Sequence, residues 1–134
     1  MRSQEKTFFE TQLDQLVANH YLPEYHYIQV RQSRSFMERY LSEKIALDEI
    51  ASTAFMSRFH YVRMFKRVYG LSPMQYLRDM RINKAKGLLK DGIGVSRVCT
   101  EVGYDSLPTF CNAFKKATGY TPGDFQNLNK SNPE

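Results

Sequence analysis

Cationic side chains follow aromatic ones in two stretches of the sequence that share a pattern. Phe65-Lys66-Arg67 in the first stretch corresponds to Phe114-Lys115-Lys116 in the second, 49 residues later. Lysine and arginine bind phosphate oxygens, and a guanidinium can also donate two hydrogen bonds to O6 and N7 of guanine. Arg63 is the best candidate for such a base contact, whereas Arg58, Lys66 and Arg67 suit phosphates. These residue types therefore predict binding to a nucleic acid.

The second stretch offers fewer side chains that can contact bases. Asn112 suits adenine, which presents N6 and N7 to an amide, while Leu107 and Pro108 offer only apolar contact, for example to a thymine methyl group. We expect the first stretch to carry more of the sequence specificity and the second to contribute mostly affinity. The candidate DNA-binding residues are Ser57, Arg58, Phe59, His60, Val62, Arg63, Lys66, Arg67, Ser106, Leu107, Pro108, Cys111, Asn112, Lys115 and Lys116.

A short amphipathic helix and a turn precede each basic stretch. Ala51 and Cys99 are small residues in these first helices, and they permit close packing of a second helix. The turns are predicted at 55–57 and 103–106, with Ser57 and Ser106 as N-caps of the second helices. This arrangement is a helix-turn-helix. The apolar positions, spaced i, i+3, i+4 and i+7, are Leu47, Ile50, Ala51 and Ala54 in the first unit and Val95, Val98, Cys99 and Val102 in the second.

The ends of the second helices also repeat. Gly70 and Gly119 suit the left-handed residue that terminates a helix. Ser72-Pro73 and Thr121-Pro122 then supply an N-cap and a first-turn proline, so a new helix begins after each unit. The helix predicted from about residue 73 to 90 links the units. About 20 residues span roughly 30 Å, close to the roughly 34 Å between successive major-groove segments on one face of B-DNA.

These patterns predict an all-α chain in which a long central helix joins two helix-turn-helix subdomains. Residues 1–34 are predicted to be an N-terminal helical extension or linker, with a helix over 5–19 and a connection over 20–32 that Pro23 interrupts. The DNA-binding domain is predicted over 35–128, beginning with a helix near 35–44. It contains a first helix-turn-helix at 47–69, a linker helix at 72–91 and a second helix-turn-helix at 95–118. A disordered tail is predicted at 129–134.

Composition favours the same class of protein. Residues 47–134 carry thirteen Lys/Arg and eight Asp/Glu and so hold the whole net charge of +5, which suggests a polyanionic partner. There is no apolar run long enough to span a membrane and no secretory signal, and the two cysteines favour a reducing compartment, so a cytoplasmic protein is expected. No catalytic constellation, metal-ligand spacing or cofactor motif is found, so we expect no enzyme, metal or cofactor.

The repeated units resemble the DNA-binding domain of the AraC/XylS family of bacterial transcription regulators over roughly residues 36–128. The resemblance implies seven helices, with two recognition helices in successive major-groove segments of promoter DNA. It also implies an activator that contacts RNA polymerase. The residues that carry it are Leu47-Asp48-Glu49-Ile50-Ala51, Phe65-Lys66-Arg67, Gly70-Leu71-Ser72-Pro73, Tyr76-Leu77, Arg81, Ala85-Lys86, Leu88-Leu89, Val102-Gly103-Tyr104, Phe110, Phe114-Lys115-Lys116, Gly119 and Thr121-Pro122.

The sequence departs from the family pattern at several places. Phe55 stands in the first turn where the family often has glycine, so a strained or reshaped turn is expected. Val62, Leu107 and Pro108 replace commonly polar positions, which leaves the target sequence open. The chain is also too short for the usual additional domain, so it resembles a short stand-alone member or an excised C-terminal domain.

Other interpretations remain open at this point. The apolar second surface also suits an architectural, non-specific DNA binder. The apolar N-terminal segment suits a helical protein-interaction module that has lost DNA binding, and the basic residues would then form only a solvated face. That segment is interpreted as an extra packed helix, a surface for self-association or for a partner, or a linker. The chain is therefore expected to be a monomer or a weak dimer. His60, beside Tyr61, is expected to pack partly or to contact a phosphate.

Overall fold

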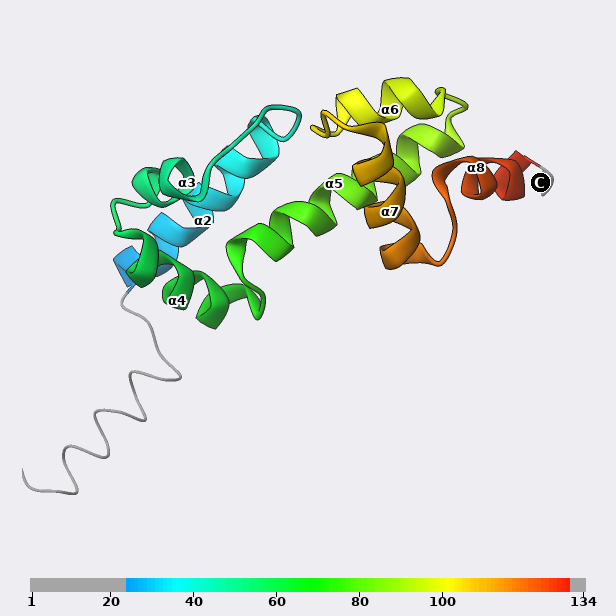
Figure 1. The fold of residues 1–134 in the computed structure, drawn as a ribbon. Helices are drawn as coiled ribbons and strands as arrows, with labels where there is room; N and C mark the ends of the chain where they lie inside the picture. Colours follow the sequence, from blue (N-terminus) through cyan, green and yellow to red (C-terminus); the bar gives the residue numbers. More distant parts are fainter. Residues whose placement is uncertain (1–23, 131–134) are drawn as a thin grey trace, which may run out of the picture.

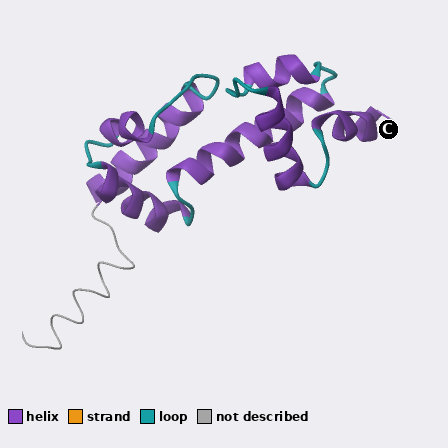
Figure 2. Cartoon of the chain, in the orientation of Figure 1, coloured by secondary structure: helices purple, strands orange, loops and turns teal. Residues whose placement is uncertain are grey.

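Residues 24–130 are described by the computed structural model, and within that range the chain forms seven α-helices and no strand (Figure 2). This confirms the predicted all-α class. The helices, in chain order, are α2 (Glu24–Arg39), α3 (Leu47–Thr53), α4 (Arg58–Tyr69), α5 (Pro73–Lys90), α6 (Val95–Glu101), α7 (Leu107–Thr118) and α8 (Pro122–Lys130).

The long helix α5 lies between two groups of helices, with α2, α3 and α4 at one end and α6, α7 and α8 at the other (Figure 1). Each group has its own apolar core. Tyr61 and Phe65 are fully buried in the first core, where α5 contributes Leu77. Phe110 and Phe114 are fully buried in the second core, where α5 contributes its C-terminal half. The two helix-turn-helix subdomains are therefore separate packing units on one shared helix.

The sequence repeat is also a repeat in three dimensions. Phe65 packs edge-on against Tyr76 with ring centroids 5.4 Å apart, and Phe114 packs edge-on against Phe125 at 5.3 Å. Gly70 and Gly119 end α4 and α7 in the left-handed conformation, with φ of 80° and 88°. These contacts fix the helix that follows each unit against the second helix of that unit.

Serine hydroxyls begin the second helices as the sequence predicts. The Ser57 hydroxyl accepts a hydrogen bond from the His60 N–H, and the Ser106 hydroxyl accepts one from the Thr109 N–H, each at 3.3 Å. The turn between α6 and α7 is one residue longer than the turn between α3 and α4. This difference accounts for the change of the repeat offset from 48 to 49 residues.

The prediction for the start of the described region was wrong. A connection was expected over 20–32 and a helix near 35–44, but α2 runs without a break from Glu24 to Arg39. Its buried positions, Val30, Ser33 and Met37, keep helical spacing, but Ser33 interrupts the apolar stripe. A proline is compatible with the start of a helix, so Pro23 in the sequence did not require a connection there.

The predicted tail also needs a correction, because α8 continues to Lys130 instead of ending before residue 129. The Asn129 side chain donates a hydrogen bond to the Phe125 carbonyl oxygen at 2.8 Å and so ties the last turn to the helix. The helix predicted over 5–19 and the rest of the tail lie outside the described residues. Among the described helices, none has both the length and the apolarity needed to cross a bilayer.

Candidate nucleic-acid interface

The outward face of α4 carries cationic and aromatic side chains that extend along the helix. The helix contains four Lys/Arg residues and no acidic residue. Tyr61, Met64 and Phe65 point into the core, as the sequence predicts. Val68 and Tyr69 also pack against it at the end of the helix. Of the predicted residues, Ser57, Arg58, Phe59, Arg63, Lys66 and Arg67 are exposed, and His60 and Val62 are half-buried.

Arg58 is positioned by a neighbouring helix. Its Nε lies 3.0 Å from Oδ1 of Asp48 on α3, and its guanidinium lies 5.9 Å from the ring centroid of Phe59. The ion pair holds Arg58 beside the start of α4 and offsets part of its charge. Arg63 and Lys66, in contrast, have no ion-pair partner within residues 24–130. They are the cations of α4 best able to meet an external anion.

His60 lies against another histidine, His26 of α2, with ring centroids 5.4 Å apart in an edge-on arrangement. Burial lowers the pKa of His60 below its ordinary value of 6.5, and the nearby His26, Arg63 and Arg67 lower it further. The imidazole is therefore held in its neutral form near neutral pH. This environment fits the expected partial packing, and it leaves the positive charge of the surface to arginine and lysine.

The outward face of α7 carries fewer charged side chains than that of α4 and is more apolar. Leu107, Pro108, Asn112, Lys115 and Lys116 are exposed, while Ser106 and Cys111 are half-buried. Phe110 and Phe114 point into the core. No ion pair of the described residues involves Lys115 or Lys116. This face can therefore bind phosphates near its C-terminal end and make apolar contacts near its N-terminal end.

The two faces occupy equivalent positions in their units, although they differ in charge. Both α4 and α7 have 12 residues, and both end in two adjacent cations followed within three residues by a left-handed glycine. The helix that joins the units has 18 residues, which corresponds to about 27 Å of helix axis. The arrangement suits a partner that offers two equivalent anionic grooves about one turn of B-DNA apart.

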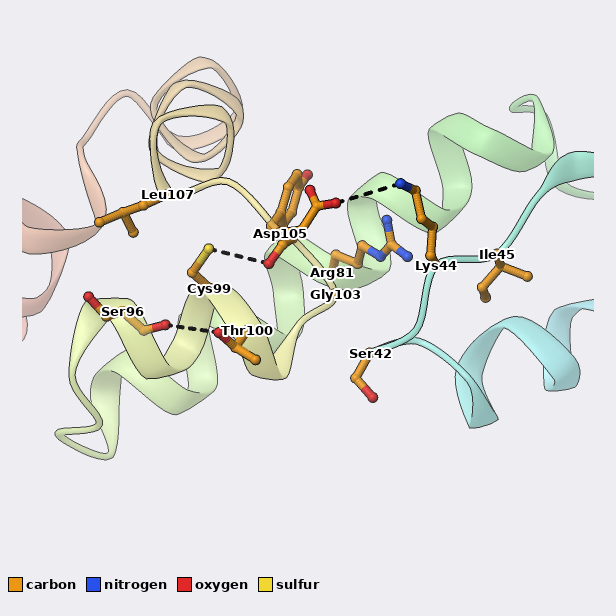
Figure 3. A pocket seen from close by; sticks show the side chains of 11 residues that line it. Ser42, Lys44, Ile45, Arg81, Ser96, Cys99, Thr100, Gly103, Asp105 and Leu107 are labelled. Atoms are coloured by element: carbon orange, nitrogen blue, oxygen red, sulfur yellow. Dashed lines mark hydrogen bonds and ion pairs between the residues drawn. The ribbon is translucent and has the colours of Figure 1, made fainter.

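Phe55 and Arg81 lie near this interface and have properties that the sequence did not predict. Phe55 was expected to strain its turn, and its φ of 58° confirms a left-handed residue, but its side chain is also 79% exposed. Arg81 entered only through the family resemblance, yet its guanidinium is half-buried between the two units (Figure 3). The sequence does contain a sign of this role, because Arg81 is a cation within the otherwise apolar stripe of the linker helix.

In the described part of the chain, no three His, Cys, Asp or Glu side chains come together. Cys99 is buried in α6, and its thiol lies 3.5 Å from the Tyr104 carbonyl oxygen. Burial raises the pKa of the Cys99 thiol, so the thiolate is disfavoured. The chemistry that the surface supports is recognition of an anionic polymer.

Comparison with known proteins points in the same direction. A family model described as a helix-turn-helix domain matches residues 50–128. The bifunctional transcriptional activator/DNA repair enzyme AdaA of Bacillus subtilis is 32% identical over 98 residues, which cover 71% of this chain and 46% of that protein. The chain spans less than half the length of the first curated relatives it matches.

Solved structures show the same fold. The C-terminal domain of AraT, a response regulator from Geobacillus stearothermophilus, is 29% identical with a TM-score of 0.71, over 75% of this chain and 84% of that domain. The DNA-binding domain of the global transcriptional factor AdpA, solved in complex with a target DNA, has a TM-score of 0.74 over 77% of this chain and 94% of that domain. At 23% identity, the second likeness concerns the fold alone.

Proposed function

The chain belongs to the AraC-type helix-turn-helix family of DNA-binding transcription regulators, and from that premise we propose that it binds a specific promoter sequence through α4 and α7. In this proposal the two helices enter adjacent major-groove segments on one face of the duplex. Arg63 contacts a base, and Lys66, Arg67, Lys115 and Lys116 contact phosphates. One observation carries the proposal. The outward faces of α4 and α7 each end in two adjacent cations, and both units are joined by the same helix, α5.

The exposed side chains of the two faces indicate different roles in binding. Arg63 of α4 and Asn112 of α7 occupy equivalent outward positions and are both exposed. A guanidinium pairs with guanine and an amide with adenine. Leu107 and Pro108 add apolar contacts at the start of α7. We therefore assign most of the sequence specificity to α4 and most of the remaining affinity to α7.

The regulatory outcome that we propose is activation, with RNA polymerase as the protein partner. The named activity of the relative AdaA supports this direction. A single chain carries both recognition helices, so a monomer can bind an asymmetric site without a palindrome. The proposal places the protein in the cytoplasm, where promoters are accessible, and it gives the chain no catalytic role.

A second candidate function is non-specific, architectural binding of DNA. The specific observation in its favour is the exposed apolar start of α7, where Leu107 is 41% exposed. Apolar side chains that insert between base steps are typical of architectural proteins. Such a protein would bind all duplexes with similar affinity, so the two functions predict different results with the same reagents.

The test is fluorescence-anisotropy titration of a random-sequence duplex over a salt series, followed by selection from a random library. The proposal predicts that affinity falls steeply with salt, because phosphate contacts release counterions. It also predicts an enriched motif with two parts about one helical turn apart. Binding without any enriched motif would favour the architectural function. The absence of binding at low salt would contradict both functions.

A further inference from the structure

Arg81 lies at the point of α5 where the two apolar cores meet. Leu77, one turn before it, belongs to the first core, and Ile82, directly after it, belongs to the second. Arg81 itself is half-buried, so the donors that it removes from water need partners within the protein. Its position and burial together raise the question of what it binds.

The guanidinium of Arg81 binds both units at once. Its Nε donates to the Leu41 carbonyl oxygen at 3.2 Å, and Nη2 donates to the Glu43 carbonyl oxygen at 2.9 Å. Both acceptors lie in the segment between α2 and α3 of the first unit. On its other side, the guanidinium lies 5.8 Å from the ring centroid of Tyr104, in the turn of the second unit.

Gly103 makes the approach of the two units possible. A Cβ atom at this position would overlap the Leu41 carbonyl oxygen and would press on the Arg81 Nε. The equivalent residue of the first unit, Phe55, meets no such neighbour and is 79% exposed. The two units therefore differ at this position. The second unit has a glycine, and its backbone without a side chain packs against the first unit.

Other contacts between these segments are weaker. Nζ of Lys44 lies 3.7 Å from Oδ2 of Asp105, but the two side chains are 92% and 84% exposed (Figure 3). Solvent and salt screen such a pair. A hollow of about 680 Å³ opens between the same segments. Arg81 is half-buried and contacts both units, so it restrains their placement more firmly than this exposed ion pair does.

We propose that Arg81 sets the distance and rotation between the two recognition helices and so determines which spacing between half-sites the protein accepts. The inference rests on the proposed function, since it requires that α4 and α7 both bind DNA. Long helices are rarely straight and curve gently, so a contact between the units helps to fix their relative placement. One inserted base pair moves the second half-site by about 3.4 Å and rotates it by roughly 36° around the duplex axis. A rigid joint rejects such a site and a flexible joint tolerates it.

The binding experiment compares the selected two-part site with versions that have one base pair inserted or deleted between the parts. We expect the wild-type protein to prefer the selected spacing by about tenfold, comparable to the cost of one mismatched base pair. Arg81→Ala should reduce this preference to less than about threefold. Arg81→Lys, which keeps the charge but lacks the planar fork, should give an intermediate preference.

The matched control is Lys84→Ala, which removes an exposed cation from the same helix that does not line the hollow between the units. It should lower affinity similarly at all spacings and leave the preference unchanged. A purely structural role of Arg81 would have this same signature, because partial unfolding lowers binding to every site alike. A spacing preference that Arg81→Ala leaves unchanged therefore overturns the inference.

A second measurement does not need DNA. Spin labels at Ser52→Cys and Ala117→Cys, in a Cys99→Ala/Cys111→Ser background, report the distance between the units by double electron–electron resonance. Arg81→Ala should broaden the distance distribution, and Lys84→Ala should not. An unchanged distribution would overturn the inference by itself. The absence of a two-part motif in the wild-type selection would instead contradict the proposed function.

Discussion

Arg63 is the residue at which the proposed base contact is tested most simply. Arg63→Ala should weaken binding to the selected site by about 1–3 kcal/mol and relax the preference for one base pair. Lys66→Ala, three residues along the same face, should weaken binding to all duplexes similarly and reduce the salt dependence. Both are measured by anisotropy titration. Equal losses on selected and random DNA would remove Arg63 from its assigned role.

Phe55 provides a test of backbone strain. A phenylalanine at φ 58° pays a steric cost of about 1–2 kcal/mol that glycine avoids. Phe55→Gly should therefore raise the free energy of unfolding by up to about 1 kcal/mol, because glycine's extra freedom in the unfolded chain offsets part of the gain. Phe55→Ala keeps the strained conformation and should show no such gain. Chemical denaturation of both variants decides between strain and loss of the ring.

His60 makes stability depend on pH. Its pKa is lowered in the folded protein, mainly by burial, so the unfolded chain binds the proton more tightly. The free energy of unfolding should therefore fall as the pH drops below 6.5, until His60 is protonated in both states. His60→Gln should flatten this part of the profile in urea titrations. A slope that persists in the variant would assign the effect to other groups.

The roles of single residues were only partly predictable from the sequence. The outward positions of α4 and α7 followed from helical spacing, because the buried aromatic residues define the opposite face. The partners of Arg58 and His60 did not follow, because Asp48 and His26 come from other helices. Arg81 could be singled out as a cation in an apolar stripe, but its carbonyl acceptors lie about 40 residues away.

At the level of elements, local sequence patterns were sufficient to predict where a helix begins when a capping residue was present. Ser57, Ser72 and Ser106 begin helices through hydrogen bonds to backbone N–H groups, and each was recognisable from its neighbours. The first part of α2 was predicted to be a connection because that stretch is aromatic-rich and follows Pro23, and Ser33 interrupts its buried apolar stripe. The hydroxyl of Ser33 is buried because it meets Tyr61 of α4, a contact between residues 28 positions apart.

This contact predicts a measurable coupling between α2 and α4. The Tyr61 hydroxyl donates to Oγ of Ser33 at 2.7 Å in a fully buried environment. Ser33→Ala should cost about 1–3 kcal/mol, because it leaves a buried donor without its acceptor, whereas Tyr61→Phe should cost about 1 kcal/mol. The double variant should cost less than the sum of the single variants. Additive costs in urea denaturation would show that the hydrogen bond does not join the helices.

At the scale of the whole molecule, the two-unit architecture was predictable because the sequence repeats itself and each unit carries its own core. The relative placement of the units was not, since no pattern in the sequence identifies the packing of Gly103 against the Leu41 carbonyl group. Placement depends on backbone surfaces that meet only after both units have folded. The inferred role of Arg81 is a property of the whole molecule, because its effect on DNA binding appears only when both units bind one duplex.

The proposed function requires that α4 and α7 of one chain both contact one duplex. Hydroxyl-radical footprinting on the selected site tests this requirement, in parallel for the wild-type protein and for Lys115→Ala/Lys116→Ala. We predict two protected stretches on one face of the duplex, centred about 10 base pairs apart, and the double variant should weaken one of them selectively. A single protected stretch that is unchanged in the double variant would show that only one of the two helices binds DNA.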